Sequence, residues 1–231
     1  MTVQSTEHFP PTPRTLVHNA LDCGDHAALA SHLMAMYERP LMIYLSATTF
    51  RTLGSPREVV ASFFADRFSR PEWLHDWREA CQKSEIPLRR WLLNALNFFL
   101  QEEARRIARD RRTQGTGGVP EVASEALAAE ASFEREAARS IVAEALRRTR
   151  AASDAAGQST HYEVFVQHFI DGKPYEVLAP IFGLTESQCA GYVRTTSAKF
   201  RRSLAQTLLD EGASTADLDS EITVLLGALR L

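Results

Sequence analysis

The sequence predicts an all-α protein, built as two small helical domains joined by a flexible linker, the second of which contains a helix-turn-helix. Three observations support this fold class. Apolar residues recur at helical spacing along most of the chain, most regularly between residues 88 and 100. A glycine-rich stretch at residues 113–120 interrupts this pattern near the middle of the chain. Two short helical segments then meet at Gly183, and no segment shows the alternation typical of a strand.

The first predicted domain covers residues 14–112 and follows an irregular, proline-rich segment at residues 1–13. Helical periodicity begins near residue 15 and continues to residue 44. We expect breaks in it at Cys23-Gly24 and at Pro40, because glycine and proline both disfavour the interior of a helix.

Two shorter helices should follow a turn at residues 54–56. The first spans residues 58–68 and collects its apolar residues on one side, namely Val59, Val60, Phe63, Phe64 and Phe68. The second contains Trp73 and Trp77, which lie four residues apart and therefore share a helical face. Both helices thus have an apolar side that must pack against the rest of the domain.

The helix expected at residues 87–112 has the most regular amphipathic pattern in the chain. Its core stripe follows helical spacing without an error and comprises Leu88, Trp91, Leu92, Ala95, Leu96, Phe99 and Leu100. Leu93, Asn97 and Phe98 are expected to face away from that stripe. Residues 104–112 contain five arginines and one aspartate, a net charge of +4.

This helix is the first candidate binding site for nucleic acid. Arginines neutralise phosphates, an exposed aromatic ring stacks on unpaired bases, and a carboxamide pairs with base edges. Two alternatives remain open. The arginines can be a solvated helix end, where cations favour the helix dipole, and the exposed apolar residues can belong to a protein interface.

The second half of the chain begins with a predicted linker at residues 113–130. A domain at residues 131–209 follows, with helices expected at 133–150 and 162–170 before the helix-turn-helix. Residues 210–231 form an acidic helical tail with an apolar stripe of Leu218, Ile222, Leu225, Leu226 and Leu229. Residues 203–231 carry five acids and one arginine, a net charge of −4.

The helix-turn-helix is predicted from residues 174–204. Gly183 can adopt the left-handed conformation that ends the first helix, and Thr185 with Gln188 can form a capping box on the second. The small core between these helices should contain Leu178, Phe182, Leu184, Cys189 and Val193. The outward face of the second helix, which enters the major groove in such units, would present Ser187, Ala190, Arg194, Ala198 and Arg201. A plain helical hairpin is the alternative.

Composition and motifs argue against several other classes of protein. The 231 residues have a formal net charge of −3, and the three cysteines are far apart, so a disulfide framework or a zinc site is not expected. We find no catalytic motif and no cofactor-binding motif, and therefore expect neither an enzyme, nor a cofactor, nor a metal site. No apolar stretch approaches the length of a membrane span, and we expect a cytoplasmic protein.

The order of these features resembles the extracytoplasmic-function sigma factors of bacterial RNA polymerase. It is closest to the planctomycete-type subgroup with a short acidic helical tail. Phe9-Pro-Pro-Thr with Thr15-Leu-Val is similar to that subgroup's amino-terminal signature, and Pro40-Leu-Met-Ile-Tyr-Leu45 to its opening helix. Residues 57–65 resemble the segment that binds the polymerase clamp, residues 88–106 the helix that melts and reads the minus-ten element, and residues 175–204 the region that reads the minus-thirty-five element.

This resemblance implies binding sites as well as partners. Polymerase contacts would come from Arg57, Glu58, Ala61, Ser62 and Phe64. DNA contacts would come from Trp91, Asn97, Phe98, Arg105, Arg106 and Arg109 in the first domain, and from Ser187, Arg194, Lys199 and Arg201 in the second. The implied partners are core RNA polymerase, at its clamp and flap, promoter DNA, and a regulatory protein such as an anti-sigma factor.

The chain also departs from the family pattern. Ala61 and Ser62 replace polar residues of the clamp-binding segment, Ala190 and Thr195 replace basic residues of the reading helix, and Pro180 lies inside a helix of the motif. A sigma-derived adaptor, which binds polymerase or another protein but reads little promoter sequence, is therefore a second hypothesis. A one-component repressor is a third, although its DNA-binding unit should lie near the amino terminus.

Overall fold

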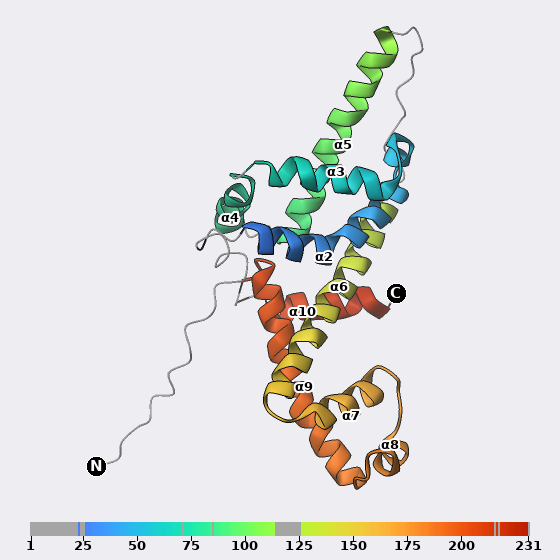
Figure 1. The fold of residues 1–231 in the computed structure, drawn as a ribbon, viewed down its shortest axis with the longest axis vertical. Coiled ribbons are helices and arrows are strands. Elements are labelled where there is room, and N and C mark those ends of the chain that lie inside the picture. Colours follow the sequence, from blue (N-terminus) through green and yellow to red (C-terminus); the bar gives the residue numbers. More distant parts are fainter. Residues whose placement is uncertain are drawn as a thin grey trace, which may run out of the picture.

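The computed structural model describes residues 23, 26–70, 72–84, 86–113, 126–214, 216 and 218–230. All regular elements in these ranges are helices, which confirms the predicted all-α class (Figure 1). The predicted irregular segment at residues 1–13, most of the linker and the break at Gly24 lie outside the described residues, so the domain boundaries stay predictions. No helix in the described ranges is long and apolar enough to cross a membrane.

The described part of the chain before the linker folds into α2 (His26–Ser46), the 3-10 helix η1 (Thr49–Leu53), α3 (Pro56–Phe68), α4 (Trp73–Ser84) and α5 (Leu88–Thr113). α3 starts with Pro56 in its first turn, where the missing backbone N–H costs no helical hydrogen bond, and Glu58 there favours the helix dipole. α5 lies across α2 and α3, and its carboxyl-terminal end projects beyond them (Figure 1).

α2 corrects one sequence prediction, because the helix continues through Pro40 and does not break there. Proline inside a helix removes one hydrogen bond and costs about 3 kcal/mol. Around Pro40 the side chains of Tyr37, Leu41 and Tyr44 are all buried in the core. Their burial holds this stretch of α2 in place and outweighs the local cost of the proline.

α5 confirms the predicted core stripe and corrects one of its neighbours. Leu88, Leu92, Leu96 and Leu100 are buried, and Trp91, Ala95 and Phe99 pack against the same core. Leu93 was expected to face away from the core, but it is 1% exposed. The amphipathic pattern describes one side of the helix only, and α2 also covers the side on which Leu93 lies.

The described part of the chain after the linker consists of α6 (Ala126–Ala155), α7 (Ser159–Phe169), α8 (Tyr175–Phe182), α9 (Glu186–Asp210) and α10 (Leu218–Arg230). The long helices α6 and α9 lie side by side, α7 and α8 pack on the far part of α9, and α10 crosses α6 and α9 (Figure 1). Leu225 of the predicted tail stripe is buried, while Leu218 and Ile222 pack against the core from partly exposed positions.

Two apolar clusters make up the described core. The larger one joins α2, α3, α4 and α5 to side chains of α6, α9 and α10, including Phe133, Ile141, Leu204 and Leu208. The smaller one holds α7, α8 and the first part of α9 together. α6 and α9 therefore contribute to both clusters, and the helix-turn-helix lies at the opposite end of the molecule from the free end of α5 (Figure 1).

Candidate nucleic-acid interface

One face of α5 presents polar and aromatic side chains to solvent. We define it as the α5 face, made up of Arg90, Asn94, Phe98, Gln101 and Arg105, which are all exposed. Their spacing of four, four, three and four residues keeps them on one side of the helix. Arg90 and Arg105 are fifteen positions apart, so the face is about 22 Å long at 1.5 Å per residue.

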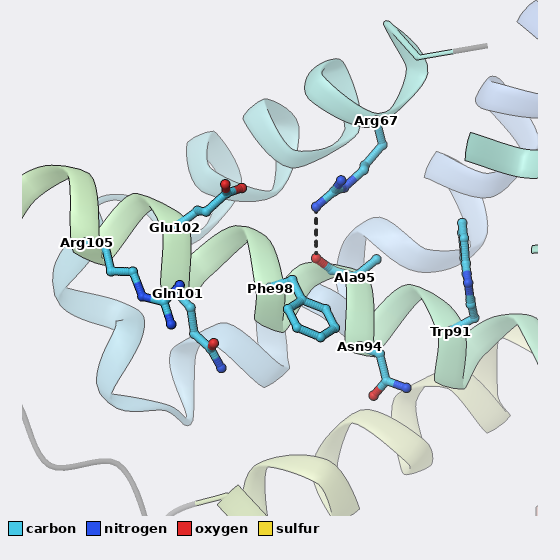
Figure 2. A pocket seen from close by; sticks show the side chains of 8 residues that line it. All are labelled: Arg67, Trp91, Asn94, Ala95, Phe98, Gln101, Glu102 and Arg105. Carbon is cyan, nitrogen blue, oxygen red and sulfur yellow. Dashed lines mark hydrogen bonds between the residues drawn. The ribbon is translucent and has the colours of Figure 1, made fainter. Parts of the chain in front are cut away.

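A cavity of about 540 Å³ opens on the α5 face, between α5 and the end of α3 (Figure 2). Its lining consists of Arg67, Trp91, Asn94, Ala95, Phe98, Gln101, Glu102 and Arg105. The ring of Phe98 is 68% exposed, as the sequence predicted. Trp91 is partly buried, and its ring lies 4.5 Å from the ring of Trp73, which fixes the wall of the cavity.

Arg67 brings a buried cation to this cavity from α3. Its side chain is only 12% exposed, and one Nη donates a long hydrogen bond of 3.4 Å to the carbonyl oxygen of Ala95 (Figure 2). Within the described structure its Nε is buried without a hydrogen-bond partner. Burial lowers the pKa of the Arg67 guanidinium, and the nearby Asp66 carboxylate opposes that change. The Asp66 carboxylate of α3 lies 3.7 Å from this Nε, and the Ala95 bond is also long, so an anionic group entering the cavity could give the guanidinium a closer partner.

The predicted DNA-binding residues of α5 have different surroundings. Arg105 lines the cavity and is exposed. Arg106 is also exposed, but it forms an ion pair of 2.6 Å with Glu103, which raises the pKa of its guanidinium. Arg109 is exposed one turn further along the helix. Of these three cations, Arg105 is therefore the one placed at the cavity.

Asn97 lies on another side of α5 from the cavity. The expectation that it faces away from the core is wrong, because its Oδ1 accepts a 2.8 Å hydrogen bond from the hydroxyl group of Tyr44 on α2. The carboxamides on the α5 face are instead those of Asn94 and Gln101. Sequence reasoning missed both, although their spacing to Phe98, four residues before and three after, was a signal for them. It also missed Arg67, which only the packing of α3 on α5 brings to the site.

The helix-turn-helix has the local structure that its residues predict. Gly183 adopts a left-handed conformation with φ of 65°, and Thr185 and Gln188 form the capping box at the start of α9. Leu178, Cys189 and Val193 are buried between the two helices, with Phe182 and Leu184 partly buried beside them. The predicted small core is confirmed.

The outward side of α9 carries few cations. Ser187, Arg194 and Arg201 are exposed, as expected for this face. Lys199 is partly buried, and its Nζ donates a 2.7 Å hydrogen bond to Oε1 of Gln158 at the turn between α6 and α7. This contact ties α9 to that turn, and it leaves Arg194 and Arg201 as the exposed cations among the four predicted residues.

The predicted polymerase-binding residues lie on α3. Arg57, Glu58, Ala61 and Ser62 share its exposed face, with Arg57 paired weakly to Glu38 at 3.6 Å. Phe64 does not lie on that face, because it is 1% exposed and its ring stacks on the ring of Phe68. It supports α3 from the core side. A cavity of about 460 Å³ adjoins the face at Arg57 and is lined by Met42, Ile43, Ser46, Ala47, Ser55 and Pro56.

Comparisons with protein-family models, with curated proteins and with solved structures find no match to this chain. Among the described residues, no group of three or more histidine, cysteine, aspartate or glutamate side chains could hold a metal ion.

Proposed function

We propose that this chain is a sigma-like transcription initiation factor, which binds core RNA polymerase in the cytoplasm and directs it to promoter DNA. The observation that carries the proposal is the cavity on the α5 face. There an exposed phenylalanine lies among two carboxamides and two arginines, Arg67 and Arg105.

These groups match the parts of an unpaired nucleotide. Phe98 can stack on a base, which contributes about 1–3 kcal/mol per base in single-strand binders. Asn94 and Gln101 can donate to and accept from base edges, which have no partner in a melted duplex. Arg67 and Arg105 can bind phosphate oxygens. The α5 face would thus hold a single strand.

The helix-turn-helix supports a second contact, with duplex DNA. α9 is capped at its amino-terminal end and exposes Ser187, Arg194 and Arg201, so this end can enter a major groove. Its outward face has two exposed cations, as many as line the α5 cavity. Because α5 also offers the exposed ring of Phe98 for stacking, we expect α9 to contribute less to affinity than the α5 face.

Two surfaces are available for polymerase. The exposed face of α3, with Glu58, Ala61 and Ser62, would bind the clamp. At the other end of the molecule, α7, the residue after it and α8 expose four apolar side chains, those of Phe169, Ile170, Val177 and Ile181. We propose that these side chains bind the flap. Such apolar groups at a surface are typical of a protein interface.

Transcription from genomic DNA tests the proposal without knowledge of the promoter. Purified chain is added to core polymerase of its host and sheared host DNA, and the 5′ ends of the transcripts are sequenced. We expect discrete start sites that depend on the chain and are lost with Phe98→Ala. A chain that neither binds core polymerase nor produces new start sites would contradict the proposal.

The sigma-derived adaptor is the second candidate, and the sparse cations of α9 favour it. Lys199 is tied to Gln158, so few groups remain to read a duplex. An adaptor would bind core polymerase as tightly as a sigma factor does, but it would give no new start sites in the same experiment. Binding and transcription, measured together, therefore separate the two candidates.

A further inference from the structure

The first residue of the α5 face, Arg90, is not free. Its Nη1 forms an ion pair of 2.9 Å with Glu130 on α6 and lies 4.0 Å from a carboxylate oxygen of Glu134. Arg90 shares one side of α5 with Asn94 and Phe98, at spacings of four and eight residues. A strand bound along this side would therefore bring a phosphate group toward the place that the Glu130 carboxylate now occupies.

The neighbouring residue, Arg89, makes a different kind of contact. Its side chain is 12% exposed and is bonded both to Glu134 at 3.2 Å and to Glu221 of α10 at 2.8 Å. By contrast, the side chains of Arg90 and Glu130 are 45% and 35% exposed. The Arg89 contacts hold α6 and α10 against the start of α5, whereas the Arg90 pair can open without exposing any buried charge.

We infer that the Glu130 carboxylate competes with nucleic acid for the Arg90 side chain, at the amino-terminal end of the α5 face. The inference rests on the proposed function, since it assumes that the α5 face binds a single strand. A carboxylate and a phosphate oxygen offer the same kind of acceptor to a guanidinium group, so only one of them can hold Arg90 at a time. Strand binding then includes the exchange of Glu130 for a phosphate, and release of the strand restores the ion pair.

This exchange lowers the affinity for the strand by the free energy of the ion pair. Exposed ion pairs contribute about 0.2–1 kcal/mol, so removing the Glu130 carboxylate should strengthen strand binding about 1.4- to fivefold. Salt screens the exposed ion pair, so the competition is strongest at low salt, and without it the dependence of affinity on salt should become steeper. If the strengthening came from net charge alone, it would persist after Arg90 is replaced, whereas competition for Arg90 would not.

The test measures binding of a fluorescein-labelled twelve-nucleotide oligo(dT) by fluorescence anisotropy, at several salt concentrations. Glu130→Gln should bind about 1.4- to fivefold more tightly than the unaltered chain. Glu163→Gln is the matched control, because it removes the same charge from a half-exposed position on α7. Arg90→Gln with and without Glu130→Gln completes a double-mutant cycle, in which the second substitution should have no effect.

The outcomes separate the inference from the proposed function. If the unaltered chain binds the oligonucleotide and Glu130→Gln binds no more tightly, the competition by Glu130 is refuted, but the proposed binding site on α5 is not. Equal strengthening by Glu163→Gln, or strengthening that persists without Arg90, refutes it as well, because both point to net charge alone. If none of the five chains binds the oligonucleotide, the strand-binding role of α5 is refuted, and the proposed competition by Glu130 is refuted with it.

Discussion

Replacing Glu211 by glutamine should change how the stability of the fold depends on pH. Glu211 follows α9 and is 3% exposed, beneath α2 and α5. Its carboxylate accepts a hydrogen bond from the hydroxyl group of Tyr37, and its backbone carbonyl accepts one of 2.8 Å from the backbone N–H of Leu88. Burial raises the pKa of the carboxyl group to about 7, although the Tyr37 hydrogen bond and the Arg89 charge oppose this; the Asp210 charge adds to the rise.

The sign of the effect follows from the two pKa values of the folded and unfolded chains. The unfolded carboxyl group has a pKa of 4.5 and the folded one about 7, so the folded chain binds the proton more tightly. The contribution of Glu211 to stability is therefore fully present below pH 4.5 and is lost as the pH rises through 7. At 1.36 kcal/mol for each pH unit, this difference corresponds to about 3 kcal/mol.

Glutamine keeps an acceptor for Tyr37 and carries no charge, so the Glu211→Gln variant should not lose stability in this way as the pH rises. If the two proteins have similar free energies of unfolding near pH 5, we expect the variant to be more stable by about 2.5 kcal/mol at pH 8. Urea melts followed by circular dichroism between pH 5 and 8 measure this difference. Other groups, among them His32 with its lowered pKa, titrate in both proteins and cancel in the comparison. Parallel curves for the two proteins would refute the buried, titrating carboxyl group.

Three further substitutions test separate parts of the molecule. Phe98→Ala should weaken single-strand binding by about 1–3 kcal/mol in an anisotropy titration, and its melting temperature should not change because the ring is exposed. Glu58→Arg should abolish copurification with core polymerase, while unchanged copurification would remove the exposed face of α3 from the proposal. Leu225→Ala, at a buried position of α10, should cost about 2–4 kcal/mol of unfolding free energy, whereas Val224→Ala, at a 61% exposed position, should stay within about 0.5 kcal/mol. Equal losses for these two would mean that α10 does not pack as described.

The parts of the fold that depend only on residues close together in the sequence were predictable. The stripe of α5 and the capping box of α9 arise from residues three or four apart, which the helical repeat brings together whatever the rest of the chain does. The left-handed Gly183 belongs to the same class, because its conformation closes a helix locally. Phe98 was predicted to be exposed because it lies off the stripe.

The parts that depend on distant residues were not predictable. Leu93 and Asn97 are covered because α2 lies against a second side of α5, and a single amphipathic stripe carries no information about a second neighbour. Pro40 stays within α2 because tertiary packing outweighs its local cost. Arg67 reaches the candidate site only through the packing of two helices whose sequences do not indicate their relative position.

The sharing of α6 and α9 between the two apolar clusters has a thermodynamic consequence. Because α6 and α9 contribute side chains to both clusters, neither cluster can unfold alone without exposing apolar surface of the other. The described helices should therefore unfold in a single cooperative transition. A fragment ending at residue 113 would expose the side of α2 that α6 covers. We expect such a fragment to aggregate, because its apolar surface would have no cover.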